Sequence, residues 1–150
     1  MDKHARILVV DDDENIRNTM KTILEDEGYI VDLAATGSEA IQKTKKSAYN
    51  VALLDIRLPD MEGIELLKLI KDTVPRTRKI MLTGYPSMQN AIAALNKNAD
   101  AYLIKPIDIE NFLNIIKEQL QLQENEKDFS EQKVAEFIET RVKEFSVDQP

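Results

Sequence analysis

The sequence of 150 residues contains no cysteine, and its only histidine is His4. Without cysteine there can be no disulfide bond, no thiolate zinc site and no cysteine nucleophile, so a bound metal must be held by oxygen atoms or by His4. Oxygen ligands favour magnesium, manganese or calcium. Because His4 lies in a charged stretch before the first expected strand, we interpret it as a surface residue.

Long hydrophobic runs and basic clusters are also missing. No apolar run approaches the roughly 18 residues of a membrane span, and the N-terminal MDKHAR does not resemble a signal peptide. We therefore expect no membrane partner and a cytoplasmic location. The net charge is −7, from 27 acidic and 20 basic residues, with no basic cluster that could follow a phosphate backbone. Direct binding of nucleic acid by this chain is disfavoured.

The residues that are present have the pattern of one α/β domain. Short apolar runs alternate with longer segments of helical period, which is typical of βα units around a parallel sheet. The expected strands are residues 6–10, 30–34, 51–54, 79–82 and 101–104. The expected helices are about 14–27, 37–46, 64–70, 86–96 and 108–122. Right-handed connections then favour an open, doubly wound sheet, whose functional loops lie at the carboxyl ends of the strands.

The C-terminal segment differs from the rest, so we divide the chain into a domain at 1–122 and a helical extension or linker at 123–150. The stretch QLQENEK (121–127) is polar and highly charged, and its last part, ENEK (124–127), suggests a flexible hinge. Asp128 and Glu131 have the spacing of a capping box. An apolar stripe follows, made of Val134, Phe137, Ile138, Val142 and Phe145. Three alternatives stay open for it: packing on its own domain, pairing in a homodimer, or leading to a missing segment.

The stretch ILVVDDDENIR (7–17) places Asp11, Asp12 and Asp13 directly after an apolar strand. Like charges this close repel one another, and burying them costs several kcal/mol unless a cation or hydrogen bonds compensate. Asp13 is interpreted as the N-cap of the following helix. Asp11 and Asp12 therefore remain to be explained.

Three further polar residues end other expected strands: Asp55, Thr83 and Lys105. Because parallel strands end at one edge of a sheet, all of these residues should gather there with Asp11 and Asp12. Three carboxylates leave a gap for a hard divalent cation, while the lysine and the threonine can bind phosphoryl oxygens. The sequence therefore predicts a Mg²⁺ and phosphoryl site, with Mn²⁺ as a substitute ion.

Four motifs in this order, VVDD, LLDIRLPDMEG, MLTG and YLIKP, make residues 5–120 resemble the receiver domain of two-component response regulators. The resemblance implies a flavodoxin-like, five-stranded parallel sheet of order 2-1-3-4-5 with helices on both faces, here followed by an extra C-terminal helix. It also implies a phosphoacceptor signalling domain, not an enzyme, with Mg-dependent self-phosphorylation and slow self-dephosphorylation. The implied partners are a sensor histidine kinase and either an effector protein or an output domain missing from the sequence.

The resemblance also implies roles for individual residues. Asp55 would be the phosphoacceptor, attacking the phosphorus of a phosphohistidine. Asp12, Asp55 and the backbone carbonyl of Arg57 would ligate Mg²⁺, with Asp11 acting mostly through water. Asp60, in the loop after Asp55, is interpreted as a solvated charge.

Other implied roles concern the response to phosphorylation. Lys105 would pair with Asp55 and then with the phosphoryl group, and Thr83 would turn inward to bond it. Tyr102 occupies the position of a switching aromatic residue, and the bond between Lys105 and Pro106 is expected to be cis. The surface formed by the fourth helix, the fifth strand and the fifth helix is expected to change partners.

Two other functions would need residues that this sequence lacks. A phosphatase of the haloacid dehalogenase type needs a second aspartate two residues after the nucleophile, where this chain has Arg57. A nucleotide-binding module needs a glycine-rich turn after the first strand, where this chain has DDDEN. A receiver-like scaffold that is never phosphorylated usually lacks one of the acidic, threonine or lysine positions, and all of them are present here.

Overall fold

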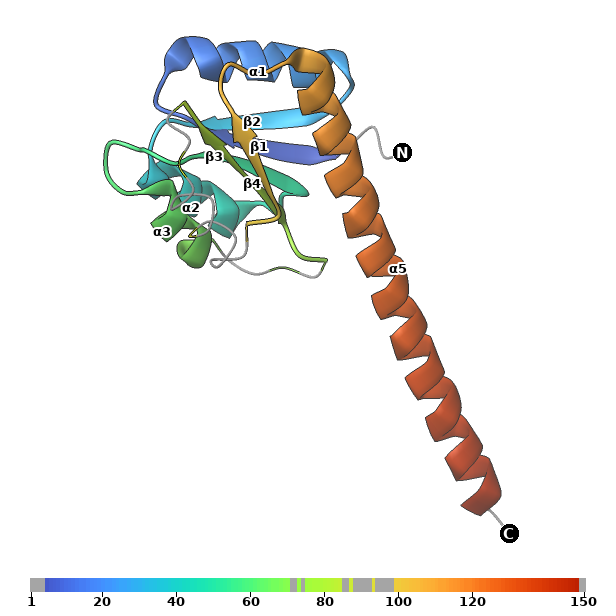
Figure 1. Ribbon diagram of the computed structural model, residues 1–150. Coiled ribbons are helices and arrows are strands. Elements are labelled where there is room, and N and C mark those ends of the chain that lie inside the picture. Colours follow the sequence, from blue (N-terminus) through green and yellow to red (C-terminus); the bar gives the residue numbers. More distant parts are fainter. Residues whose placement is uncertain are drawn as a thin grey trace.

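A computed structural model describes residues 5–70, 73, 75–84, 87, 93 and 99–148, with the backbone alone described at 144–148. The sheet is parallel and has the strand order β2-β1-β3-β4-β5 (Figure 1). Its strands are β1 Arg6–Val10, β2 Ile30–Ala34, β3 Val51–Asp55, β4 Arg78–Thr83 and β5 Ala101–Ile104. The strand order implied by the resemblance is confirmed.

The register of the sheet aligns the carboxyl ends of its strands. Val10 of β1 lies opposite Leu54 of β3, and Asp55 lies opposite Leu82 of β4. Residues that directly follow β1 and β3 are therefore neighbours although they are far apart in the sequence. This edge is where the polar residues of the sequence motifs meet.

Helices cover both faces of the sheet. Their bounds are α1 Glu14–Asp26, α2 Gly37–Lys46, α3 Gly63–Leu69 and α5 Ile109–Asp148. Helices α1 and α5 enclose one hydrophobic cluster with the sheet, and α2 and α3 enclose the other. Except for residues 87 and 93, the helix expected at 86–96 lies outside the described residues.

Local sequence signals explain the ends of α1 and α2. The carboxylate of Asp13 accepts hydrogen bonds from two amides in the first turn of α1, as expected of an N-cap. Gly28, which follows that helix, has φ of 94°, a conformation that glycine adopts without strain. At α2, Thr36 accepts from the amide of Glu39, whose carboxylate accepts from the amide of Ala35. These two reciprocal hydrogen bonds form a capping box.

Helix α5 corrects one expectation, because it runs without a break from Ile109 to Asp148. The hinge expected at 124–127 is wrong, and Asp128 and Glu131 lie inside the helix instead of capping a new one. The sequence has no glycine and no proline from 107 to 149, so no strong helix breaker interrupts it. The extra C-terminal helix is thus the continuation of α5. No helix in the described parts of the chain combines the length and apolar character that a membrane crossing requires.

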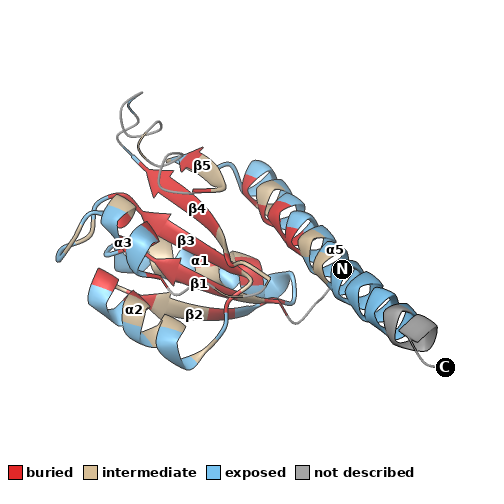
Figure 2. Ribbon diagram, turned by 90° about the horizontal axis from the view of Figure 1, so that it is seen from below, coloured by how far each residue is buried: buried red, intermediate tan, exposed pale blue. Residues whose placement is uncertain are grey.

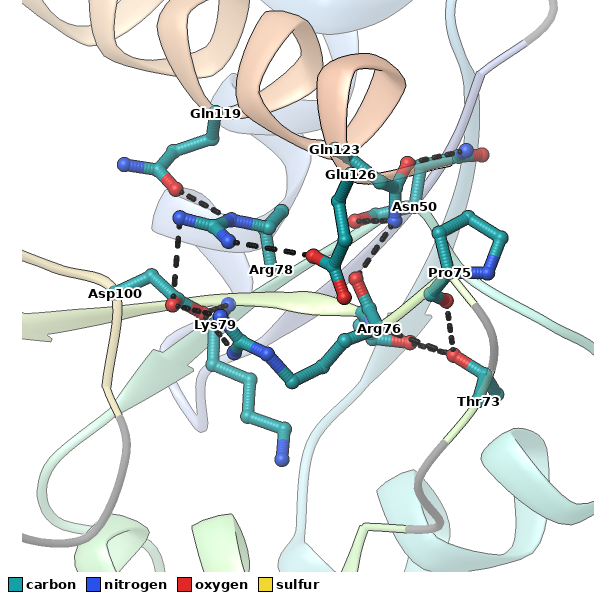
Figure 3. Close-up of polar contacts among 11 residues, drawn as sticks. Asn50, Thr73, Pro75, Arg76, Arg78, Lys79, Asp100, Gln119, Gln123 and Glu126 are labelled. Carbon is teal, nitrogen blue, oxygen red and sulfur yellow. Dashed lines mark hydrogen bonds and ion pairs between the residues drawn. The ribbon is translucent and has the colours of Figure 1, made fainter. Parts of the chain in front are cut away.

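Buried polar contacts attach the middle of α5 to the amino ends of the strands (Figure 3). The amide of Gln123 donates to the backbone carbonyl of Asn50 at 3.1 Å and accepts from the Asn50 side chain at 2.8 Å. Arg78 donates to Gln119 at 2.8 Å and lies 3.8 Å from Glu126. These contacts fix the direction of α5 at the point where it leaves the sheet.

Asp100 forms the centre of the neighbouring network in Figure 3. Its carboxylate accepts two hydrogen bonds from Arg76, at 2.8 and 2.7 Å, and lies 3.4 Å from Arg78. It also accepts from the backbone amide of Lys79 at 2.8 Å. The buried charge of Asp100 is therefore fully compensated.

Candidate functional site

Three carboxylates meet at the carboxyl edge of the sheet. Asp11 and Asp12 follow β1 and Asp55 ends β3, and one oxygen atom of each lies within 4.8 Å of the others. Asp11 is completely buried and Asp55 is 9% exposed, whereas Asp12 is exposed. The predicted convergence of these residues is confirmed, and the exposed member gives the group access to solvent.

Lys105 reaches this acidic group from the end of β5. Its Nζ lies 2.7 Å from Oδ2 of Asp11 and 3.4 Å from Oδ2 of Asp55. The shorter contact is therefore to Asp11, although the resemblance implied a pairing with Asp55. This ammonium group contacts two of the three carboxylates, so the part of the pocket that the structure describes carries an excess of negative charge.

The pKa values of the pocket reflect this imbalance. Burial raises the pKa of Asp55, and the charge of Asp11 raises it further against the opposing effect of Lys105. Burial by itself would lower the pKa of Lys105, but the hydrogen bond and charge of Asp11, together with Asp55, raise it above its ordinary value. Lys105 therefore stays protonated, and the ionised form of Asp55 gains from any further positive charge.

The backbone around Asp55 is held by a close approach of Gly63. The amide of Gly63 donates to the carbonyl of Ile56 at 2.6 Å, and a Cβ at Gly63 would collide with the carbonyl oxygen of Asp55. Glycine is therefore required here to position the acidic strand end. Arg57 lies two residues after Asp55, and its backbone amide lies 3.3 Å from Oδ1 of Asp55. The sequence analysis placed Arg57 in the site but did not single out Gly63.

Asp60 is an exposed loop charge, as expected, but its carboxylate also has fixed hydrogen-bond partners. Its carboxylate accepts from the backbone amides of Gly37 and Ser38, each at 2.9 Å. Both amides lower the pKa of Asp60, with Ser38 contributing most. Because these amides begin α2, Asp60 ties the loop after Asp55 to the N-terminus of that helix.

The model of the response regulator receiver domain matches residues 7–117. The chain belongs to this family. A receiver is a phosphoacceptor signalling domain of two-component systems and not a classical enzyme. The three carboxylates are thus the acidic pocket of a receiver, with a donor set suited to a metal ion.

Among curated relatives, the chain is 36% identical over 123 residues to "Regulatory protein AtoC" of Escherichia coli (strain K12), covering 82% of this chain and 27% of that protein. It thus spans about a quarter of that relative's length. A solved CheY-like receiver domain protein from Methanospirillum hungatei JF-1 is 48% identical, with a TM-score of 0.78 over 82% of this chain and 98% of that one. A response regulator from Burkholderia pseudomallei, solved with a phosphorylated aspartic acid, calcium and citrate, is 29% identical, with a TM-score of 0.71 over 84% and 74% of the two chains.

The two residues expected to respond to phosphorylation lie on the neighbouring strands β4 and β5 of this receiver. Thr83 ends β4 and is 3% exposed, and its backbone carbonyl accepts from the amide of Lys105 at 2.7 Å. Tyr102 packs against the cluster beneath α2 and α3, and its buried hydroxyl has no hydrogen-bond partner among the described residues. The bond between Lys105 and Pro106 is cis, as expected.

An apolar hollow of about 590 Å³ adjoins the receiver pocket. It lies between α1, which contributes Ile16 and Met20, and the start of α5, which contributes Ile109 and Phe112. Lys105 also lines it, so an occupant of the hollow would lie next to the acidic group. The sequence analysis missed this feature because it arises from the packing of two distant helices.

Proposed function

We propose that this receiver accepts a phosphoryl group on Asp55 from a phosphohistidine of a sensor histidine kinase, in a Mg²⁺-dependent reaction located in the cytoplasm. The observation that carries the proposal is the contact of one protonated lysine with two buried members of a three-carboxylate group. Asp55 ends the wholly buried strand β3, so its carboxylate has a fixed position at the edge of the sheet.

In the proposed step, a carboxylate oxygen of Asp55 attacks the phosphorus atom. The new P–O bond forms as the P–N bond breaks, and the electron pair of that bond stays on the imidazole of the donor. A carboxylate is a weak nucleophile, but phosphoryl transfer depends mainly on positioning and on neutralising charge. Lys105, held in place by Asp11, supplies a fixed positive charge for a phosphoryl oxygen. The same arrangement supports self-phosphorylation from small donors, followed by slow hydrolysis.

The donor set of the pocket fits a hard divalent cation, because it consists of oxygen atoms and carries excess negative charge. Asp12, Asp55 and the backbone carbonyl of Arg57 would hold Mg²⁺ or Mn²⁺, with Asp11 acting through water. A bound ion supplies positive charge that offsets repulsion between the carboxylates and the phosphoryl oxygens. Exposed Asp12 leaves the site open to solvent.

The proposed output is a change of protein partners. The hydroxyl of Thr83 would bond the phosphoryl group and draw the end of β4 inward, and the ring of Tyr102 would rotate into the space that opens. The buried Tyr102 hydroxyl supports this, because it gives up no hydrogen bond to a described residue when it moves. The surface of β5 and α5 would then bind an effector protein or an output domain outside this sequence, without direct contact of this chain to nucleic acid.

Acetyl phosphate with Mg²⁺ tests the chemistry, with intact mass as the readout. We expect one phosphoryl adduct on the wild-type chain, none with EDTA and none on Asp55→Asn. Asp60→Asn is the matched control, because it removes a carboxylate from the same loop without touching the pocket, and it should be phosphorylated. An equal adduct on Asp55→Asn would show that another residue is the acceptor. Lys105→Ala should slow adduct formation.

Calorimetric titration with Mg²⁺ tests the metal ligands. We expect the wild-type chain to bind Mg²⁺ weakly and Asp12→Ala to lose at least about tenfold in affinity, because one of the few anionic ligands is gone. Asp13→Asn is the matched control, since asparagine also caps a helix and Asp13 lies outside the carboxylate group. Unchanged affinity in Asp12→Ala would remove this residue from the site.

A further inference from the structure

The C-terminal part of α5 projects beyond the receiver as a free-standing helix (Figure 1). Every residue from 131 to 143 is exposed, whereas the part of α5 next to the sheet is partly buried (Figure 2). Its large apolar side chains are 56–61% exposed, at Phe129, Val134, Phe137, Ile138 and Val142. Because the helix is unbroken, this segment cannot fold back on its own receiver. The side chain of Phe145, expected to continue the stripe, lies outside the described part of the chain.

The exposed stripe points to the same side of α5 as the residues that pack on the sheet. Three exposed residues repeat the positions of three buried ones 18 residues earlier, a spacing of about five helical turns. The buried residues are Ile116, Gln119 and Leu120, and the exposed ones are Val134, Phe137 and Ile138. A helix that packs on this stripe therefore lies on the side of the receiver body, beyond its edge.

Four residues of the exposed segment have the spacing of a coiled-coil seam. Glu131, Val134, Ile138 and Arg141 follow one another at intervals of 3, 4 and 3 residues. Phe137 flanks this seam, and the guanidinium of Arg141 lies 5.1 Å from the centre of its ring. The seam thus has two apolar residues at its centre and charges of opposite sign at its ends.

This order of residues is complementary to itself when two such helices run in opposite directions. If Val134 faces Ile138 of a second copy, then Glu131 faces Arg141 of that copy. Two-fold symmetry repeats both pairs, and it brings the two Phe137 side chains together near the axis. Each end of the apolar centre is then closed by an ion pair.

A parallel arrangement is disfavoured for two independent reasons. In register, it would set Glu131 against Glu131 and Arg141 against Arg141, so like charges would meet at both ends of the seam. A parallel partner would also run back into the receiver body, because the stripe and the sheet-facing residues share one side of α5. In the antiparallel arrangement the two bodies lie at opposite ends of the helix pair.

We propose that the receiver forms an antiparallel homodimer through residues 131–141 of α5, with Val134 and Ile138 at the centre and Glu131 paired with Arg141 of the second copy. The pocket around Asp55 takes no part in this contact. Dimer formation is therefore independent of phosphorylation, and Asp55→Asn should dimerise like the wild-type chain.

Sedimentation velocity across a concentration series tests the charge pairs. Glu131→Arg and Arg141→Glu should each raise the dissociation constant of the dimer about tenfold or more, because two opposite-charge contacts become two like-charge contacts. The double variant, which exchanges the two charges, should return close to the wild-type value. A wild-type chain that stays monomeric at about 100 μM, a concentration well above the dissociation constant of a stable dimer, would overturn the proposal. Single variants that dimerise like the wild type would overturn the antiparallel pairing.

Ile138→Asp and Phe129→Asp form a matched pair, since each adds one charge at an exposed apolar position of the same helix. Phe129 lies off the seam, and its ring is covered by Lys133 at 5.4 Å. Ile138→Asp should abolish the dimer, and Phe129→Asp should leave it intact. Equal loss in both variants would contradict the assignment of the seam, and circular dichroism should show the same helix content in both.

The cysteine-free chain allows a direct test of direction. Val134→Cys and Ile138→Cys chains carrying tags of different size are mixed and oxidised. The antiparallel pair predicts mixed disulfides between the two variants as the main product, because these positions face each other. Predominant disulfides between identical variants would indicate a parallel dimer and overturn the proposal.

Discussion

Buried charge is compensated at one end of the sheet and left in excess at the other. At the amino ends of the strands, Asp100 is matched by Arg76, Arg78 and a backbone amide. At the carboxyl ends, a group of three carboxylates has one lysine, which contacts two of them, and the pKa of Asp55 is raised. A balanced network needs nothing from outside the chain and serves to hold α5. An unbalanced one is stabilised when a cation binds, and this requirement for an external charge separates a functional network from a structural one.

Removing Asp100 should have the largest effect on stability. We expect Asp100→Ala to lower the free energy of unfolding by about 3 kcal/mol, because two arginines and a buried amide lose their acceptor. Urea denaturation measures this loss. Glu126→Ala is the control at the same end, where one half-exposed contact of 3.8 Å is lost and the expected change is below about 0.5 kcal/mol. Equal losses of stability in Asp100→Ala and Glu126→Ala would mean that the contacts of Asp100 do not stabilise the fold together.

Removing a charge at the other end should have a smaller effect of opposite sign. In EDTA, Asp55→Asn should raise the free energy of unfolding by about 1 kcal/mol, because a buried charge beside Asp11 is removed. Since the pKa of Asp55 is raised in the folded state, the wild-type chain loses stability relative to the variant as the pH rises above the ordinary value of 3.8. Saturating Mg²⁺ should reduce or reverse the difference by binding the folded wild type. If Asp55→Asn were less stable than the wild type in EDTA, the excess of negative charge in the pocket would not destabilise the folded chain.

The smallest effect is expected at Asp60, an exposed carboxylate whose hydrogen bonds lower its pKa. A lowered pKa in the folded state gives stability that is present above the ordinary value of 3.8 and is lost as the pH falls through the folded value. Asp60→Asn should therefore be less stable than the wild type at pH 7 and equal to it at about pH 2. Thermal denaturation at both pH values measures the difference. If the variant were still less stable than the wild type in acid, the charge of Asp60 would be ruled out as the cause of the difference.

The parts of the receiver that the sequence predicted depend on local patterns or on the geometry of parallel strands. β3 is apolar at four successive positions, so its burial could be expected, and Asp55 follows from where the strand ends. The gathering of Asp11, Asp12 and Asp55 needed only the parallel direction of the strands. Lys105 was placed correctly for the same reason, but its preference for Asp11 depends on side-chain packing that no spacing reveals.

The features that escaped sequence analysis depend on contacts between distant residues. The stretch at 121–127 is polar, but Gln123 is buried because it binds Asn50, which is 73 positions away. Asp60 is the exposed loop charge that was expected, but its contact with the start of α2 could not be foreseen, because the two segments are more than 20 residues apart. The capping-box spacing at Asp128 and Glu131 carried no weight because the preceding residues were already helical.

The unbroken course of α5 also makes it a lever. The helix is clamped to the sheet by Gln119 and Gln123, begins four residues after Lys105, and extends about 37 Å from Gln123 to Asp148. A tilt of about 5° at the clamp would move the far end by about 3 Å, as follows from that length and the helical rise. A shift at the start of α5, about 21 Å from Gln123, would thus be nearly doubled at the far end of the helix, where it would be easiest to detect by measuring distances between labels.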